Sequence, residues 1–152
     1  MNREQTLNAF WNSFDVPAYD AITTPTDDEM QKMGKKPFPR ITYEVRVNEF
    51  GVPTSLLASI WDRSTGWEGV STIASKIDSR LSEGGQTMPY DKGVIWFKKG
   101  NLFLQRMADP DDAIRRIVVN IEVEYLEVWQ ILLKKTVKLF FGVDYCVRYS
   151  IG

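Results

Sequence analysis

The sequence predicts an α+β fold, in which a mixed, mostly antiparallel sheet of about four to six strands carries helices on one face. The first observation behind this is the stretch of residues 114–126, IRRIVVNIEVEYL, where apolar and polar side chains alternate. Successive side chains of a strand point to opposite faces, so one face of this strand is buried and the other is largely polar. Such strands are typical of antiparallel or mixed sheets covered on a single side. The second observation is helical apolar spacing in residues 3–14 and 67–83.

The length and composition fit one globular domain. At 152 residues the chain can bury a stable hydrophobic core without help from disulfides or bound metal ions. Its single cysteine, Cys146, excludes an internal disulfide. The net charge of −1 gives no general reason to expect binding to nucleic acid or to an anionic membrane. The start MNREQTLNAFW lacks the apolar core of a signal peptide, and no segment reaches the ~20 apolar residues of a membrane span. We therefore expect a soluble protein, made inside the cell, with no membrane partner.

The first forty residues are expected to form one helix and a long arm. In the helix of residues 3–14, Asn2 and Gln5 form a capping-box pattern. Its apolar stripe consists of Leu7, Phe10, Trp11 and Phe14. Residues 15–40 contain four prolines, which exclude a continuous helix or a central strand. We interpret this proline-rich segment as an extended arm, and the alternative is a plain surface connection.

Two hairpins are predicted in the middle of the chain. Residues 41–48 alternate apolar and polar side chains, and a turn leads to a returning strand at residues 56–61. After a second turn at residues 88–92, strands at 94–98 and 102–107 would flank the turn sequence Lys-Gly-Asn.

An amphipathic helix is predicted between the hairpins, at residues 67–83. Ser64 or Thr65 would start it, and the pair Gly84-Gly85 would stop it. Its apolar stripe should lie against the sheet and consists of Trp67, Val70, Ala74, Ile77 and Leu81.

The C-terminal part divides into the end of the domain and an extension. The sequence DPDD at residues 109–112 resembles a helix start and is predicted to make one helical turn. Residues 1–126 then form one α+β domain, and residues 127–152 form a C-terminal extension, predicted as a short helix and a possible strand. The extension has four basic and two acidic residues. A basic amphipathic tail could contact nucleic acid or an acidic partner, whereas the simpler interpretation is an extra element of the same domain.

The residues give no sign of catalytic chemistry. The chain has no histidine, the usual general base and the commonest metal ligand. It also has no phosphate-binding loop, dinucleotide fingerprint, HExxH or GxSxG motif. Glu122 and Glu124 share one face of a strand and could hold a divalent ion, but such pairs are far more often a solvated surface. We therefore expect no catalytic residues, no metal and no cofactor, and a protein that is not an enzyme.

A resemblance to a known family rests on the order and the amino-acid sequences of several segments. The segments are FPRITYEV, LLASIWDRSTGWEGV, KGVIWFKKG and QRMADPDDAIRRIVVNIEVEYL. Together they resemble small neck-region proteins of tailed phages and prophages of Gram-positive bacteria, in particular the tail terminator, or tail completion, class. The resemblance covers roughly residues 5–126 and lies in the overall pattern, without a short diagnostic motif.

The resemblance implies a virion structural protein that assembles into a hexameric ring. Such a ring caps the completed tail tube, stops its polymerisation and presents a surface to the head–tail connector protein. The implied partners are other copies of the chain, the tail tube protein and the connector protein, with DNA passing through the lumen without specific binding. The implied location is the virion tail or neck, after assembly in the host cytoplasm.

Candidate contact and lumen positions are inferred from residue type, because no individual residue transfers from the family. Ring closure requires one patch to meet a different patch on the neighbour, and tryptophan and arginine are favoured at interface centres. The interface candidates are Trp61, Arg63, Trp67, Tyr90 and Lys92, and Trp67 could equally be a core residue. The lumen candidates are Glu44, Glu122 and Glu124, whose negative charge would repel DNA phosphates.

Two other functions are compatible with the sequence. One is another neck protein or a minor tail protein. The other is a small enzyme or nucleic-acid-binding module, which the absence of histidine and of a basic, aromatic patch in residues 1–126 disfavours.

Overall fold

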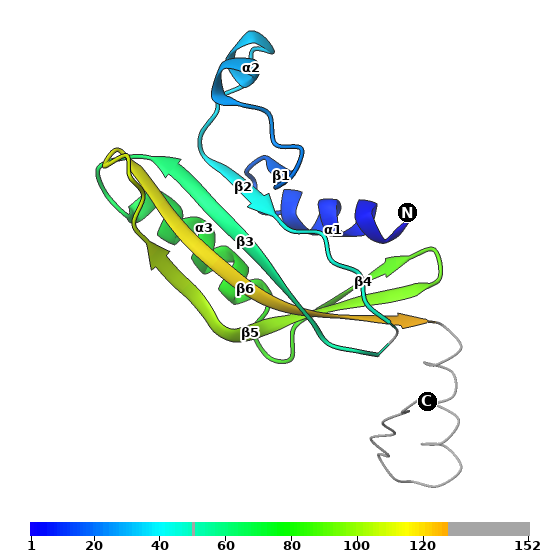
Figure 1. The fold of residues 1–152 in the computed structure, drawn as a ribbon. Coiled ribbons are helices and arrows are strands. Elements are labelled where there is room, and N and C mark those ends of the chain that lie inside the picture. The colour runs from blue at the N-terminus through cyan, green and yellow to red at the C-terminus, as the bar shows by residue number, and fades with distance from the viewer. Residues whose placement is uncertain (50, 128–152) are drawn as a thin grey trace, which may run out of the picture.

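The computed structural model describes residues 1–49 and 51–127. Within these residues the chain forms a curled, mixed sheet of six strands and three helices, which confirms the predicted α+β class (Figure 1). In chain order the elements are α1 (Arg3–Asn12), β1 (Ala18–Asp20), α2 (Asp27–Lys32), β2 (Arg40–Tyr43), β3 (Thr54–Arg63), α3 (Glu68–Arg80), β4 (Gln86–Tyr90), β5 (Gly93–Met107) and β6 (Ile114–Glu127).

Three long strands form the centre of the sheet. The strand order is β1-β2-β3-β6-β5-β4, and β6 pairs antiparallel with both β3 and β5. The short β1 pairs parallel with β2, which makes the sheet mixed. The predicted alternation of β6 is confirmed, because the side chains on its covered face are at most 5% exposed: Ile117, Val119, Ile121, Val123 and Tyr125.

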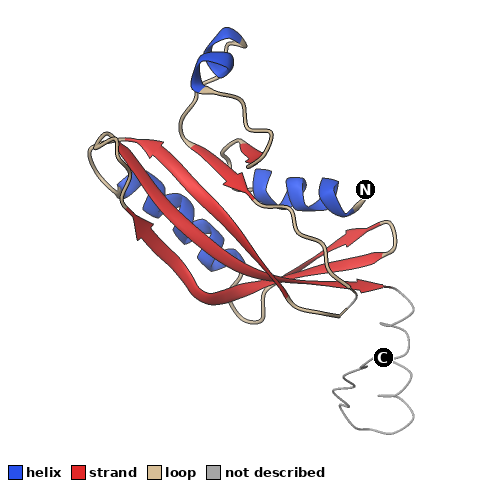
Figure 2. Ribbon diagram, viewed as in Figure 1, coloured by secondary structure: helices blue, strands red, loops and turns tan. Residues whose placement is uncertain are grey.

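Helices α1 and α3 pack on the same face of the sheet, whereas α2 stands clear of it (Figure 2). Phe10 of α1 stacks on Phe97 of β5, with ring centroids 4.0 Å apart. The apolar stripe of α3 joins the same core, and Ile77 is completely buried there. Among the described residues no helix covers the opposite face, so the sheet is one-sided as the sequence predicts.

Both helices are shorter than predicted. The capping box of α1 is confirmed, because Asn2 Oδ1 accepts from the Gln5 amide at 2.9 Å and Gln5 Oε1 accepts from the Asn2 amide at 2.9 Å. The helix ends at Asn12, just before Asp15 adopts a positive φ of 63°. Helix α3 begins at Glu68 with Trp67 as its N-cap residue and no side-chain cap, so a cap from Ser64 or Thr65 was a wrong prediction.

The proline-rich segment 15–40 contains regular structure that the sequence analysis missed. Strand β1 lies in it, and Thr26 caps α2 through a reciprocal pair of hydrogen bonds with Glu29. Met30 of α2 is completely buried, and the Asp27 carboxylate forms an ion pair with Arg40 at 2.7 Å. The prolines bound these short elements rather than preventing them. The segment contains no continuous helix or central strand, as predicted, but it is not a plain loop either.

The first predicted hairpin is confirmed, but its strands have different lengths. Strands β2 and β3 pair antiparallel, with Ile41 opposite Ile60. Strand β2 ends at Tyr43, not at residue 48: the Glu44 amide still donates to the Leu57 carbonyl of β3, and the chain then leaves the ladder. The Tyr125 hydroxyl donates to the Arg46 carbonyl at 2.9 Å, and Val47 is 48% exposed.

The second predicted hairpin is wrong, because β5 is one continuous strand across Lys99-Gly100-Asn101. A register shift between Lys99 and Leu104 absorbs the extra residues as a β-bulge. The Asn120 side chain of β6 holds this bulge by donating to the Asn101 carbonyl at 2.8 Å. The actual hairpin joins β4 to β5 at Asp91-Lys92, so most of the predicted turn at 88–92 is strand.

Two smaller predictions concern the end of the domain. Residues 109–112 form side-chain-capped turns in place of a helical turn: Asp109 accepts from the Asp111 amide at 3.0 Å, and Asp111 accepts from the Ala113 amide at 2.9 Å. The helix and strand predicted in the C-terminal extension lie outside the described residues.

Candidate functional site

The candidate functional site is the face of the sheet turned away from α1 and α3, which we call the open face. The strand register assigns to it every second residue of the central strands. Its main members are Arg40, Thr42, Ser55, Leu57, Ser59, Trp61, Trp96, Lys98, Arg116, Val118, Asn120, Glu122 and Glu124. The face divides into an acidic end and an end rich in arginine and tryptophan.

Lys98 lies between the two predicted lumen glutamates at the acidic end. Its ammonium is 2.9 Å from Glu122 Oε1 and 3.6 Å from Glu124 Oε2, and it lies 4.5 Å from the centre of the Trp96 ring. Burial by itself lowers the pKa of Lys98, but the hydrogen bond to Glu122 and the charges of Glu124 and Glu122 outweigh it, so the pKa is raised. The cation between these glutamates is therefore a protein side chain.

Glu44, the third predicted lumen residue, follows β2. Its amide donates to the Leu57 carbonyl at 2.9 Å, so the residue continues the pairing with β3 by one position. Its carboxylate forms an ion pair with Arg46 at 3.0 Å. All three glutamates thus have a cationic partner, and the field of this end is weaker than that of three free carboxylates.

Trp61 and Arg116 define the other end of the open face. They are cross-strand partners on β3 and β6, and the guanidinium of Arg116 lies 4.5 Å from the centre of the Trp61 ring. Arg116 Nε donates to Ser59 Oγ at 3.1 Å, and Trp61 Nε1 donates to Thr42 Oγ1 at 2.9 Å. We call these four residues the Trp61–Arg116 patch.

Arg63, another interface candidate, lies beside this patch. It is exposed, forms an ion pair with Asp111 at 3.3 Å and stacks over the Phe38 ring at 5.2 Å. Arg40 also lies over the Phe38 ring, with its guanidinium 4.7 Å from the ring centre. The structure therefore brings Trp61 and Arg63 to one end of the sheet, as a joint contact surface requires.

The remaining interface candidates differ in how much surface they offer. Trp67 is half-buried against the core and stacks with Arg106 at 4.8 Å, so its packing role is clear from the structure. Tyr90 and Lys92 lie at the far end of the sheet, where Gly93 pairs with Glu127. Tyr90 is only 8% exposed, whereas Lys92 is exposed.

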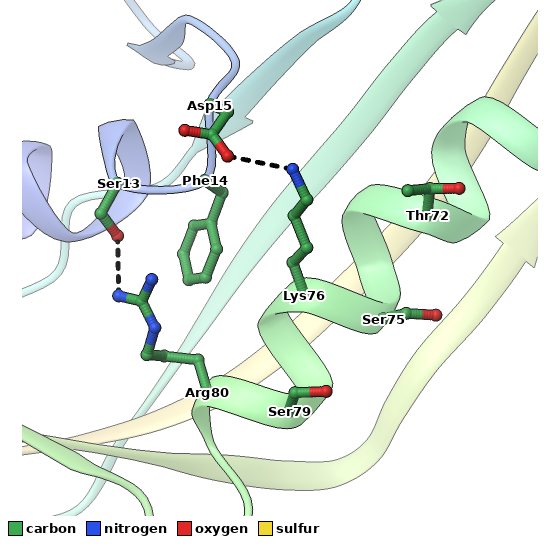
Figure 3. A pocket seen from close by; sticks show the side chains of 8 residues that line it. All are labelled: Ser13, Phe14, Asp15, Thr72, Ser75, Lys76, Ser79 and Arg80. Carbon is green, nitrogen blue, oxygen red and sulfur yellow. Dashed lines mark hydrogen bonds and ion pairs between the residues drawn. The ribbon is translucent and has the colours of Figure 1, made fainter.

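A shallow groove on the helical side was also considered as a site. It lies between the end of α1 and α3, as Figure 3 shows. Its charged groups are paired: Lys76 contacts Asp15 at 3.0 Å, and Arg80 donates to Ser13 Oγ at 3.2 Å while covering the Phe14 ring. The other lining residues are Thr72, Ser75 and Ser79. The contacts across this groove therefore hold the end of α1 against α3.

Compared by sequence, the chain matches no protein-family profile and no functionally described protein. The site must therefore be interpreted from its own geometry.

That geometry is a broad sheet surface of paired charges and aromatic rings. Residues 1–49 and 51–127 contain no cluster of three or more carboxylate, cysteine or histidine side chains that could hold a metal. In the same part of the chain, no helix has the length and apolar character needed to cross a bilayer. What the open face offers is paired charge, half-buried tryptophan rings and an arginine with unused donors.

Sequence reasoning missed Lys98 and Arg116. Both follow from the strand register: Lys98 is opposite Glu122, and Arg116 is opposite Trp61. The contacts of Arg116 are with Ser59 and Trp61 of β3. Alternation in β6 places Arg116 on the polar face together with Glu122, and that signal could have identified it.

Proposed function

We propose that this protein is a virion assembly protein of a tailed phage or prophage that forms a ring at the end of the tail tube. In this role it stops tube polymerisation and provides the surface that joins the tail to the head. The resemblance of residues 5–126 to the tail terminator class motivates the proposal. Its partners would be further copies of the chain, the tail tube protein and the head–tail connector protein.

The observation that carries the proposal is the one-sided sheet. Helices α1 and α3 bury one face, and the other keeps a broad surface of mostly half-buried polar, charged and aromatic side chains. A surface of this kind fits a protein whose function is to bind other proteins. In the ring, the end with Glu44, Glu122 and Glu124 would face the lumen, where paired charges of both signs give DNA phosphates little to bind.

The placement of the interface candidates supports a head-to-tail contact. Arg63 is opposite the first residue of β6, and Gly93, next to Lys92, is opposite the last. β6 has 14 residues, so at about 3.3 Å per residue the two ends are roughly 45 Å apart. Two different patches on opposite ends of a subunit are what a heterologous, ring-closing interface needs.

Electron microscopy of particles that lack the protein tests the proposal. Tails of uncontrolled length that fail to join heads are the expected result. Tails of normal length that still fail to join heads would favour another neck protein. Complete particles with normal tails would refute both roles.

A second measurement addresses the ring itself. Light scattering of the purified protein over a range of concentrations should detect a defined oligomer, and addition of the tail tube protein should promote it. A chain that remains monomeric in the presence of assembled tubes would contradict ring formation.

A further inference from the structure

We propose that the Trp61–Arg116 patch is a docking site for a protein partner that presents one carboxylate surrounded by apolar side chains. The proposal rests on the assembly role above, since it names the partner chemistry of the same open face. Four observations carry it: the unused donors of Arg116, the absence of a counter-ion, the rigidity of the patch and the apolar character of its surroundings.

The guanidinium of Arg116 is held from two sides and open on the third. Its Nε donates to Ser59 Oγ at 3.1 Å, and Trp61 supports one flat side at 4.5 Å. Within the described residues its two terminal nitrogens make no hydrogen bond. Two parallel N–H groups of a guanidinium match the two oxygens of a carboxylate, so the free edge is suited to a bidentate contact.

The charge of Arg116 is also unmatched, in contrast to the arginines beside it. Arg40 pairs with Asp27 at 2.7 Å and Arg63 pairs with Asp111 at 3.3 Å. Arg116 forms no ion pair with any residue of 1–49 or 51–127, although it is half-buried. Arginine is rarely buried without a partner, so a negatively charged group from another molecule would complete this site.

The patch is rigid before any partner arrives. Ser59 is only 7% exposed and lies beneath the guanidinium, and the Trp61 indole is fixed by its hydrogen bond to Thr42 at 2.9 Å. A side chain already held in its binding geometry loses little conformational entropy when a ligand binds. The preformed arrangement of Arg116 and Trp61 therefore favours the binding of a carboxylate.

The surroundings favour a protein carboxylate over a DNA phosphate. Met107 is the partner of Arg116 on β5, Val118 is the next open-face residue on β6, and Leu57 nearby on β3 is 39% exposed. Tryptophan, arginine and methionine are residues typical of the centre of a protein interface. DNA-binding surfaces instead offer several unneutralised cations to successive phosphates, whereas Arg40 and Arg63, the other arginines at this end of the open face, are already paired with aspartates.

Side-chain NMR with a defined probe tests the site. The probe is the acetylated and amidated peptide Leu-Glu-Leu, and Leu-Gln-Leu is its uncharged control. Titration to tens of millimolar should shift the Nε–H signal of Arg116 and the indole N–H signal of Trp61 in a saturable way with the glutamate peptide only. Arg116→Gln can keep a hydrogen bond to Ser59 and should weaken binding at least about tenfold. The matched control is Arg80→Gln on the helical side, where the arginine also donates to a serine hydroxyl and covers an aromatic ring, and it should bind as the wild type does.

Three results would overturn the proposal. The first is no shift with Leu-Glu-Leu, and the second is an equal shift with Leu-Gln-Leu, provided that backbone spectra show all variants folded. The third is a short DNA duplex that shifts both signals at lower concentration than the peptide and with a steep salt dependence, which would assign the patch to phosphate. Failure of the assembly role looks different, since particles lacking the protein would then be normal while the peptide still binds.

Discussion

Tyr125 offers a test of how the end of β6 is held in the core. Its ring is completely buried, and its hydroxyl donates to the Arg46 carbonyl at 2.9 Å. Burial raises the pKa of Tyr125 from 10.0 to about 12, because the phenolate is poorly solvated there. The perturbation we consider is Tyr125→Phe, which removes the hydroxyl and keeps the ring.

The expected effect of this change reverses with pH. At pH 7 the variant should be less stable by about 1 kcal/mol, because the Arg46 carbonyl loses its donor. Above pH 10 the unfolded wild type releases the tyrosine proton before the folded form does, so its stability falls by up to about 1.4 kcal/mol per pH unit, a little over ~2 kcal/mol by pH 12. The Phe variant lacks this loss, so the two stabilities should become equal near pH 11.

Urea unfolding followed by circular dichroism at a series of pH values measures both curves. Tyr43 also has a raised pKa, owing first to burial, but it is present in both proteins and cancels in the difference. A stability gap that stays constant from pH 7 to beyond pH 11 would refute the argument, because it would mean that the Tyr125 hydroxyl titrates alike in the folded and unfolded chains.

Two further predictions concern packing. Ile77→Asp places a charge in the core under α3 and should prevent folding. Its control, Ser75→Asp on the exposed side of the same helix, should fold normally by gel filtration and circular dichroism. A folded Ile77→Asp protein would mean that α3 faces the other way. Gly85→Ala should destabilise the protein more than Gly84→Ala, by roughly 1–3 kcal/mol in urea unfolding, because its Cβ would overlap the Phe97 carbonyl oxygen while that of Gly84 meets open space. Both glycines have positive φ, so the strain of alanine is shared, and equal losses would contradict the close approach of the β4 end to β5.

The parts of the fold that sequence reasoning found are those with a long local signal. The alternation of β6 persists over many residues and matches its burial pattern of one covered face. The stripe of α3 repeats over several turns, and all four of its buried residues face the sheet. The capping box of α1 is contained in four consecutive residues, so no distant contact is needed to recognise it.

The parts that were missed depend on partners far away in sequence. Lys-Gly-Asn has the composition of a hairpin turn, yet Asn120 from another strand supports it as a bulge inside β5. Strand β4 contains Pro89, which reads locally as a turn but is acceptable in an edge strand. Helix α2 did carry a local signal, since Thr26 and Glu29 have capping-box spacing. The prolines around it exclude a long helix but leave room for its six residues.

The candidate site was predictable only in outline. A polar sheet face was expected from alternation, and Trp61 and Arg63 were selected for their residue types. The contacts that give the face its chemistry are cross-strand, such as Arg116 with Trp61 from 55 positions earlier in the chain. Register decides such contacts, and register depends on turn geometry and on the bulge, which local patterns did not reveal.

The bulge in β5 has a consequence for the proposed ring, because it limits how one copy of this chain could add to the sheet of another. Strand β4 stops opposite Phe97, so in the described chain Lys98–Met107 pairs with β6 alone and has an unpaired backbone on its outer side. The irregular stretch there, with Leu102 at a positive φ of 55°, interrupts the row of donors and acceptors that an incoming strand would need. Strand-by-strand growth has no natural end, whereas contacts between side chains fix an angle between subunits, and a fixed angle lets an assembly close on itself.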